Sequence, residues 1–445
     1  VEAYGGRAVL TDIRYDPEAG KLVAHAVASG VELASLKDLS KRDDLSGTGG
    51  FVGELRVSPE GPVLTGQATL TSFCVAQAPE CGVSAELALA WPELTLSHAE
   101  VQFLGCRAEV TGSARAPDDE NDAGKLELRL DGAGPLRQLA DTYLPKSLPV
   151  AGKLTLSATV SGTFKSPGVA ADVQIAGGTL KGIPVTRFEA RGTLKGDTGR
   201  LDTLSLALAG AELKASGEMG PGRKLALEFV ADPVPLALAL RMADLEGPAQ
   251  GFFRVRGSVT GTPDDPLVSA TVDSADLSLD ETDFGALHGS VSYRQQGVHL
   301  SPLTWRLNGG SLTAEGRVPV SSPEDKEKPA PADLLDCTVA WEKLTFGELH
   351  RLGEEVSTLL DNNEQPAQSL NDTLFYLRKL RHSPDGVLTG RAVVRGALTD
   401  PQVPEALLTV TGGKVGDEPL PEFTLEAAYG DRKVFCRSLR ADLAH

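Results

Sequence analysis

A glycine followed five residues later by a proline recurs three times within sequence that otherwise alternates between apolar and polar residues. The three blocks read VSGTFKSPGVAADVQIAGGTL from Val160, VTGTPDDPLVSATVDSADLSL from Val259 and VRGALTDPQVPEALLTVTGGKV from Val394. Their anchor pairs are Gly162/Pro167, Gly261/Pro266 and Gly396/Pro401. Internal repeats of this kind predict an array of similar units rather than one compact globule.

The repeat continues on both sides of these anchors. Leu204 follows Gly162 by 42 residues, and Leu303 follows Gly261 by the same 42 residues. Glycines seven residues apart also recur, at Gly105/Gly112, Gly210/Gly217 and Gly309/Gly316. We therefore expect a degenerate first copy ahead of the three clear ones.

Most of the chain alternates with a period of two residues. Leu154, Leu156 and Val160 are separated by polar residues such as Thr155. Strict alternation is typical of antiparallel strands with one buried and one wet face. Turn signals separate the strands, namely SPEG at 58–61, GDTG at 196–199, RQQG at 294–297 and YGDR at 429–432. We expect a meander of hairpins made of about thirty short strands.

Short segments with helical periodicity precede the glycine–proline blocks. An amphipathic stripe is present in 136–144, 349–360 and 370–377, and a shorter one in 33–39. The segment 235–244 occupies the matching place before the third unit, but its pattern fits a helix and a strand equally well. We expect these helices to cap or plug the sheet at the unit boundaries.

These signals define the expected organisation of the chain. In order, it comprises strands and a short boundary helix (1–45), a degenerate first unit (46–133), a helix with the second unit (134–233), a helix-like segment with the third unit (234–320), a charged, proline-rich linker (321–332), a strand with a helical insert (333–385), and a fourth unit cut short at the C-terminus (386–445). Because the last unit is incomplete and Val1 is not a methionine, we expect an internal fragment of a longer protein.

A long sheet with one apolar face must cover that face or curl around it. The helical segments are too few to cover it, and sheets twist, so the expected fold is mostly β: an elongated, repeating antiparallel sheet curled into a taco-like groove. The alternation predicts that the groove is lined by Leu154, Leu156, Val160, Val173, Ile175, Leu204, Leu206, Val255, Val259, Val272, Leu303, Trp305 and Leu307. An open apolar groove suits acyl chains, which need only to be shielded from water. The alternative is an interior filled by the protein's own side chains.

Charge and motifs exclude several classes of function. The formal net charge of -18 over 445 residues disfavours nucleic acids as partners and a polybasic mode of membrane binding. No apolar window approaches the length of a membrane-spanning helix. No sequence motif points to a catalytic, metal or cofactor site, so we expect a protein that is not an enzyme and has no cofactor.

Three local patterns have alternative interpretations. Gly47–Gly53 (GTGGFVG) lacks the spacing and the lysine of a phosphate loop, which favours a turn. The acidic run at Asp273, Asp276, Asp280 and Asp283 lacks EF-hand spacing, which favours a solvated strand face over a calcium site. Cys74 and Cys81 flank a short loop and either form a disulfide in an oxidising compartment or remain buried thiols.

The strand runs, the glycine–proline blocks, the GGTL, GGSL and GGKV segments and the boundary helices resemble the AsmA-like superfamily, most closely its TamB group, over roughly 30–445. The resemblance implies a periplasmic protein of the Gram-negative envelope, anchored in the inner membrane outside this fragment. It also implies an outer-membrane β-barrel partner of the assembly-module type and phospholipid acyl chains as the cargo. Phospholipid transport between the two membranes is then the expected function. The alternatives are a scaffold for outer-membrane protein assembly and a structural β-solenoid.

Overall fold

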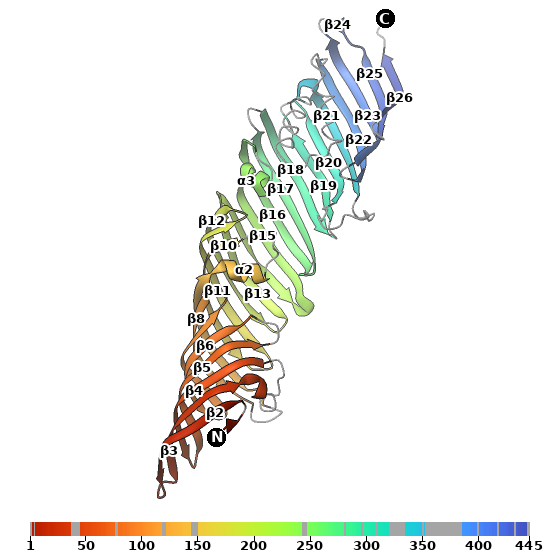
Figure 1. The fold of residues 1–445 in the computed structure, drawn as a ribbon. Helices are drawn as coiled ribbons and strands as arrows, with labels where there is room; N and C mark the ends of the chain where they lie inside the picture. Colours follow the sequence, from red (N-terminus) through yellow and green to blue (C-terminus); the bar gives the residue numbers. More distant parts are fainter. Residues whose placement is uncertain are drawn as a thin grey trace. The chain divides into compact units, whose positions relative to one another are not determined.

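The computed structural model describes residues 2–3, 5–36, 45–75, 79–117, 122–143, 150–242, 247–279, 282–294, 297–307, 309–319, 334–348, 351, 385–397, 400–415, 418–430 and 433–442. The chain divides into two compact units (Figure 1). Unit 1 comprises Val1–Ala209 with Glu218–Gly222, and unit 2 comprises Gly210–Gly217 with Arg223–His445. The division falls within the second of the expected repeats.

Unit 1 is built on antiparallel strands connected in chain order. They are β1 (Glu2–Ala3), β2 (Gly6–Asp16), β3 (Lys21–Glu32), β4 (Leu45–Ser58), β5 (Gly61–Val75), β6 (Cys81–Ala90), β7 (Glu93–Phe103), β8 (Cys106–Arg115), β9 (Lys125–Pro135), β10 (Val150–Gly162), β11 (Pro167–Leu180), β12 (Ile183–Lys195) and β13 (Thr198–Leu208). The strand β14 (Ala211–Gly220) and a short 3-10 turn (Pro221–Arg223) lie at the division between the units.

Unit 2 has the same construction. Its strands are β15 (Lys224–Pro235), β16 (Ala249–Thr262), β17 (Asp265–Leu279), β18 (Thr282–Arg294), β19 (Gly297–Arg306), β20 (Ser311–Pro319), β21 (Leu335–Thr345), β22 (Asp385–Ala397), β23 (Asp400–Val415), β24 (Glu418–Pro419), β25 (Glu422–Gly430) and β26 (Lys433–Asp442). Within each unit, the described pairings join neighbours in the chain, except that β23 pairs with both the two-residue strand β24 and β25. None of the described pairings joins the first strand of a unit to its last, so neither sheet closes into a barrel.

The glycine–proline blocks close hairpins. Gly162 lies opposite Pro167 where β10 meets β11, and Gly261 lies opposite Pro266 where β16 meets β17. The third pair occupies the same place between β22 and β23. The glycines adopt positive φ values, 104° at Gly162 and 87° at Gly261, which other residues rarely adopt. Each Pro lies at or beside the start of the returning strand, where a missing N–H is tolerated.

The seven-residue glycine spacing also has a structural counterpart. Gly112, Gly217 and Gly316 have φ values of 130°, 146° and 130°. In all three, a Cβ atom would lie 2.0–2.2 Å from a carbonyl oxygen of the adjacent strand. The repeated position therefore requires glycine, because the next strand lies too close for a side chain.

The described residues form 26 strands, and many of them are longer than the short strands that the sequence suggested. β11 has 14 residues and β23 has 16, and each continues through a glycine pair. Gly177 and Gly412 adopt positive φ without ending the strand. Likewise, the expected turn at Gly47–Gly53 is part of β4. Glycines within these strands accommodate bulges rather than turns.

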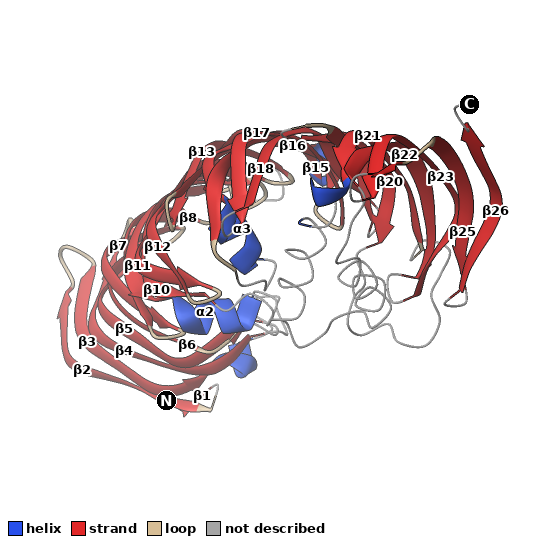
Figure 2. Cartoon of the chain, turned by 90° about the horizontal axis from the view of Figure 1, so that it is seen from above, coloured by secondary structure: helices blue, strands red, loops and turns tan. Residues whose placement is uncertain are grey.

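Short helices precede two of the hairpins. They are α2 (Leu136–Tyr143), before β10, and α3 (Leu236–Met242), before β16; a 3-10 turn (Leu33–Leu36) precedes β4. In each unit the sheet is curved and its helix lies on the concave side (Figure 2). Strands account for 82% of the structure and helices for 7%, which confirms a curled, mostly-β fold with short boundary helices. Apart from Arg351, the helices expected at 349–360 and 370–377, and the linker at 321–332, lie outside the described residues.

Candidate functional site

The two faces of each sheet differ in exposure, as the alternation predicts. On β10, Leu154 and Leu156 are half-buried and Ala158 is buried, whereas the intervening Lys153 and Thr155 are exposed. All thirteen of the predicted lining residues are half-buried. These side chains are therefore neither fully buried nor fully exposed to solvent.

The register brings six of the predicted lining residues of unit 1 into two rows across four strands, β10 to β13. The first row consists of Leu156, Val173, Ala190 and Leu204, and the second of Leu154, Ile175, Phe188 and Leu206. Directly opposed side chains of an antiparallel pair have Cβ atoms about 4.5–5.5 Å apart. The two rows, called here the unit 1 rows, are thus continuous apolar strips perpendicular to the strands. Val160 extends this face beside Val169 and Leu128.

A neighbouring row of smaller side chains was missed in the sequence. From β10 back to β3 it consists of Ala158, Leu130, Val110, Ala99, Ala85, Ala68, Phe51 and Ala28. Three of its alanines are buried, including Ala99 at 3% exposure. These residues also alternate with polar ones in the sequence. Alanine is only weakly apolar, however, so its alternation with polar residues is harder to recognise than that of leucine or valine. The apolar face of unit 1 therefore extends well beyond the predicted residues.

Unit 2 repeats the arrangement. Val255 lies opposite Val272, Val259 opposite Val268, and Leu303 opposite Ala314. A longer strip, called here the unit 2 row, crosses from β18 to β26 and consists of Leu287, Trp305, Leu312, Trp341, Gly390, Leu408, Leu425 and Leu439. Trp305 is the one predicted lining residue in this row.

Near α3, the same face is filled by the protein itself. Leu277, Leu279 and Phe284 form a buried cluster against which Leu236 and Leu240 of α3, Trp305 and Leu307 pack. The Trp305 Nε1–H donates to the Phe284 carbonyl oxygen at 2.5 Å. A second buried cluster comprises Leu344, Leu388 and Val410, and Leu307 also packs against it. Trp305 and Leu307 therefore belong partly to a packed core, which the sequence did not predict.

The opposite face carries exposed ion pairs. Arg191 Nη2 donates to Asp172 on the adjacent strand at 2.5 Å, and Arg129 Nε donates to Asp131 at 2.7 Å. Hydrogen bonds from Arg129 and Ser157 lower the pKa of Asp131. Exposed pairs of this kind contribute about 0–1 kcal/mol each to stability. Their main consequence is a wet, charged face opposite the apolar one.

Cys74 and Cys81 are not bridged in the structure, where both are half-buried thiols. Phe73 lies opposite Cys81. Because side chains alternate along a strand, Cys74 then points to the opposite face from Cys81. Burial, together with the nearby Cys74, raises the pKa of Cys81. This register favours the thiol interpretation.

Of the acidic run, Asp273, Asp276 and Asp283 are described, and Asp280 lies outside the described residues. Asp273 pairs with His288, and Asp283 accepts a hydrogen bond from the Gly285 N–H at 2.8 Å. No group of three or more His, Cys, Asp or Glu residues suited to a metal ion is present among the described residues.

Comparisons of the chain with protein-family models, curated proteins and solved structures give no match. Among the described helices, none is long and apolar enough to cross a membrane.

Proposed function

We propose that the chain is a non-enzymatic envelope protein whose apolar sheet face binds lipid acyl chains and carries phospholipid between the inner and outer membranes. The proposal includes a periplasmic location, anchoring to the inner membrane and an outer-membrane β-barrel partner. The observation that supports it is the set of continuous apolar rows on one face of each unit, half-buried apart from the exposed Leu439 at the end of the unit 2 row.

An acyl chain matches such a strip chemically. Its methylene groups make no hydrogen bonds, and each one removed from water contributes about 0.8 kcal/mol. The unit 1 rows present aliphatic side chains and the ring of Phe188, without a charged residue among their members. A charge placed in a row would have to lose its water whenever an acyl chain covered it, which is strongly unfavourable.

A second candidate is a structural or scaffolding protein with a filled interior. The buried clusters around Phe284 and Leu344 favour it, because there the apolar face is occupied by the protein's own side chains. The two candidates differ in whether the unit 1 rows accept a ligand.

Native mass spectrometry with lipid extraction, on the chain purified from a bacterial envelope, tests the proposal. We expect co-purifying phospholipids, and we expect the double variant Leu156→Asp, Leu206→Asp to lose the lipid bound in unit 1. The matched control is Thr155→Asp, Thr203→Asp, which adds the same charges at exposed positions of the same strands. A folded chain that co-purifies with no lipid and does not bind added phospholipid would support the second candidate, a structural or scaffolding protein with a filled interior.

A further inference from the structure

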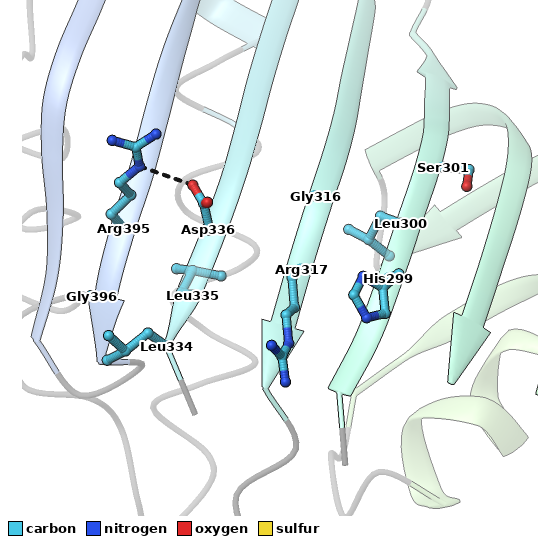
Figure 3. Close-up of a pocket in the computed structure, with 10 residues that line it drawn as sticks. All are labelled: His299, Leu300, Ser301, Gly316, Arg317, Leu334, Leu335, Asp336, Arg395 and Gly396. Carbon is cyan, nitrogen blue, oxygen red and sulfur yellow. Dashed lines mark hydrogen bonds and ion pairs between the residues drawn. The ribbon is translucent and has the colours of Figure 1, made fainter. Parts of the chain in front are cut away.

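A pocket of about 610 Å³ lies in unit 2, across β19, β20, β21 and β22. Its polar lining includes His299, Arg317, Asp336 and Arg395 (Figure 3). The register places Arg317 opposite both His299 and Asp336, and Asp336 opposite Arg395. These four residues, the cationic row, therefore share one face of four adjacent strands and span about 14 Å at the usual strand spacing.

The cationic row is on the opposite face from the apolar strip. Leu300 and Gly316 lie opposite each other, one position along from His299 and Arg317. Because successive side chains point to opposite faces of a sheet, the cations and the apolar row occupy different sides. The four polar side chains are therefore on the other face from the apolar strip, whereas the pocket is also lined by Leu300 and Leu335, which belong to the apolar face.

Asp336, whose carboxylate is the only one in the cationic row, forms an ion pair with Arg395. Arg395 Nε donates to Asp336 Oδ1 at 2.9 Å, drawn as the dashed line in Figure 3. No ion pair joins Arg317 to Asp336 among the described residues, although the two residues are directly opposed. Two permanent positive charges thus share one negative charge in a chain whose net charge is -18.

Among the described residues, no carboxylate forms an ion pair with Arg317. Its Nε is buried and has no hydrogen-bond partner in the described part of the chain. The guanidinium lies against the backbone of Gly297, where a Cβ atom would be only 2.8 Å from Nε and 3.2 Å from one terminal nitrogen. A guanidinium without a carboxylate partner is unfavourable when it is partly desolvated, and an anion at its terminal N–H groups would supply the missing counter-charge.

We propose that this pocket binds a phosphate group, held by Arg317 and His299 on adjacent strands. Guanidinium groups pair with phosphate through forked hydrogen bonds, and the oxygens of a tetrahedral anion point toward several strands at once. The volume is that of a small-molecule site, so it accommodates the group that carries the phosphate as well. Free phosphate and a phospholipid headgroup share this chemistry.

Isothermal titration calorimetry with inorganic phosphate tests the site on the full chain. This ligand has no acyl chain, so the result does not depend on the proposed lipid function. We expect binding that Arg317→Gln weakens about tenfold or more, the effect of losing hydrogen bonds to a charged group. Gly297→Ala keeps every charge but displaces the guanidinium, and we expect it to weaken binding as well.

The matched control is Arg306→Gln, which removes the same charge from the exposed polar face at the other end of β19. We expect this variant to bind phosphate within about twofold of the wild-type affinity. Arg306 does not contact the pocket, and its long-range electrostatic effect is screened by salt. Circular dichroism establishes that all variants are folded.

Flotation with vesicles of phosphatidylglycerol or phosphatidylcholine distinguishes the sources of the phosphate. Binding to phosphatidylglycerol that inorganic phosphate displaces and Arg317→Gln removes identifies a headgroup site, whereas phosphate binding without flotation identifies a free anion. The proposal is overturned if neither phosphate nor vesicles bind, or if Arg306→Gln weakens binding as much as Arg317→Gln does.

Discussion

Aromatic rings lie over glycines at several points of the apolar face. Phe229 is opposite Gly257, and Trp341 is opposite Gly390. A Cβ atom on Gly257 would lie 2.5 Å from the ring of Phe229 and 2.3 Å from the Ser269 carbonyl oxygen. The ring covers backbone that glycine would otherwise leave exposed, so these glycines contribute packing as well as conformational freedom.

Gly257→Val should destabilise unit 2. The added side chain has no space, and overpacking of this kind costs about 1–3 kcal/mol. Urea unfolding followed by circular dichroism measures the change. Gly430→Ala is the control, because no atom lies within 4 Å of the Cβ it would add, and we expect it to change stability by less than about 0.5 kcal/mol. Equal effects of the two substitutions would contradict the packing argument.

The cysteines should differ in reactivity according to their burial. Desolvation is the main cause that raises the pKa of Cys337, with a further contribution from the nearby Asp336. A raised pKa lowers the thiolate fraction at neutral pH, and the thiolate is the species that reacts. We expect iodoacetamide to modify the exposed Cys436 first and Cys337 last, with Cys337 gaining reactivity as the pH rises.

Mass spectrometry of the alkylated peptides at two pH values measures these rates. All five cysteines should react alike in urea, because unfolding removes the burial. Equal rates for Cys337 and Cys436 in the folded chain would show that burial does not protect Cys337.

At the scale of single elements, features that depend on a few neighbouring residues were predictable from the sequence. Features that depend on contacts between distant strands were not. The glycine–proline hairpins followed from the sequence because a positive φ and a missing N–H are demands of a single turn. The helical character of α3 did not, since its alternating leucines fit two periodicities. Its contacts with Leu277 and Phe284 come from β17 and β18, which no local pattern brings to it.

Strand register limits the prediction of the lining residues in the same way. A bulge inserts one residue and reverses the parity of everything beyond it. The pairing of β19 with β20 shifts between Leu300 and Leu303. Leu300 and Leu303 are three residues apart and would point to opposite faces of a regular strand. The one extra residue between them reverses the alternation, so Leu303 lies on the apolar face. The alternation alone specifies neither the place nor the direction of such a shift.

Phe284 should be the most sensitive position of the cluster beside α3. It is 4% exposed, and its ring centroid lies 5.2 Å from that of Trp305. Phe284→Ala leaves a cavity in the cluster, and we expect a loss of about 3–5 kcal/mol. Urea unfolding followed by circular dichroism measures the loss. Phe252→Ala is the control, since that ring is 58% exposed and its removal should cost little.

Across the whole molecule, both units follow the same chemical plan. Each has an apolar face crossed by rows and an opposite face with exposed ion pairs such as Arg191–Asp172 and Arg391–Glu405. The charge of -18 keeps the wet faces soluble and discourages pairing at strand edges. The sequence predicted this division of faces because it depends on alternation, which recurs throughout. It did not predict how much of the apolar face would be covered by the protein itself.

The duplication of the apolar face predicts that lipid binding and lipid transport respond differently to charge. Leu156→Asp with Leu206→Asp places charges only in unit 1, and Val255→Asp with Val259→Asp only in unit 2. If each unit binds acyl chains by itself, either pair should remove only part of the bound lipid seen by native mass spectrometry. All four substitutions together should remove most of it. Transfer of fluorescent phospholipid between vesicles should instead stop with either pair alone, since a conduit fails at its first desolvated charge. Transfer that falls only in proportion to the lipid lost would indicate separate binding sites rather than a continuous path.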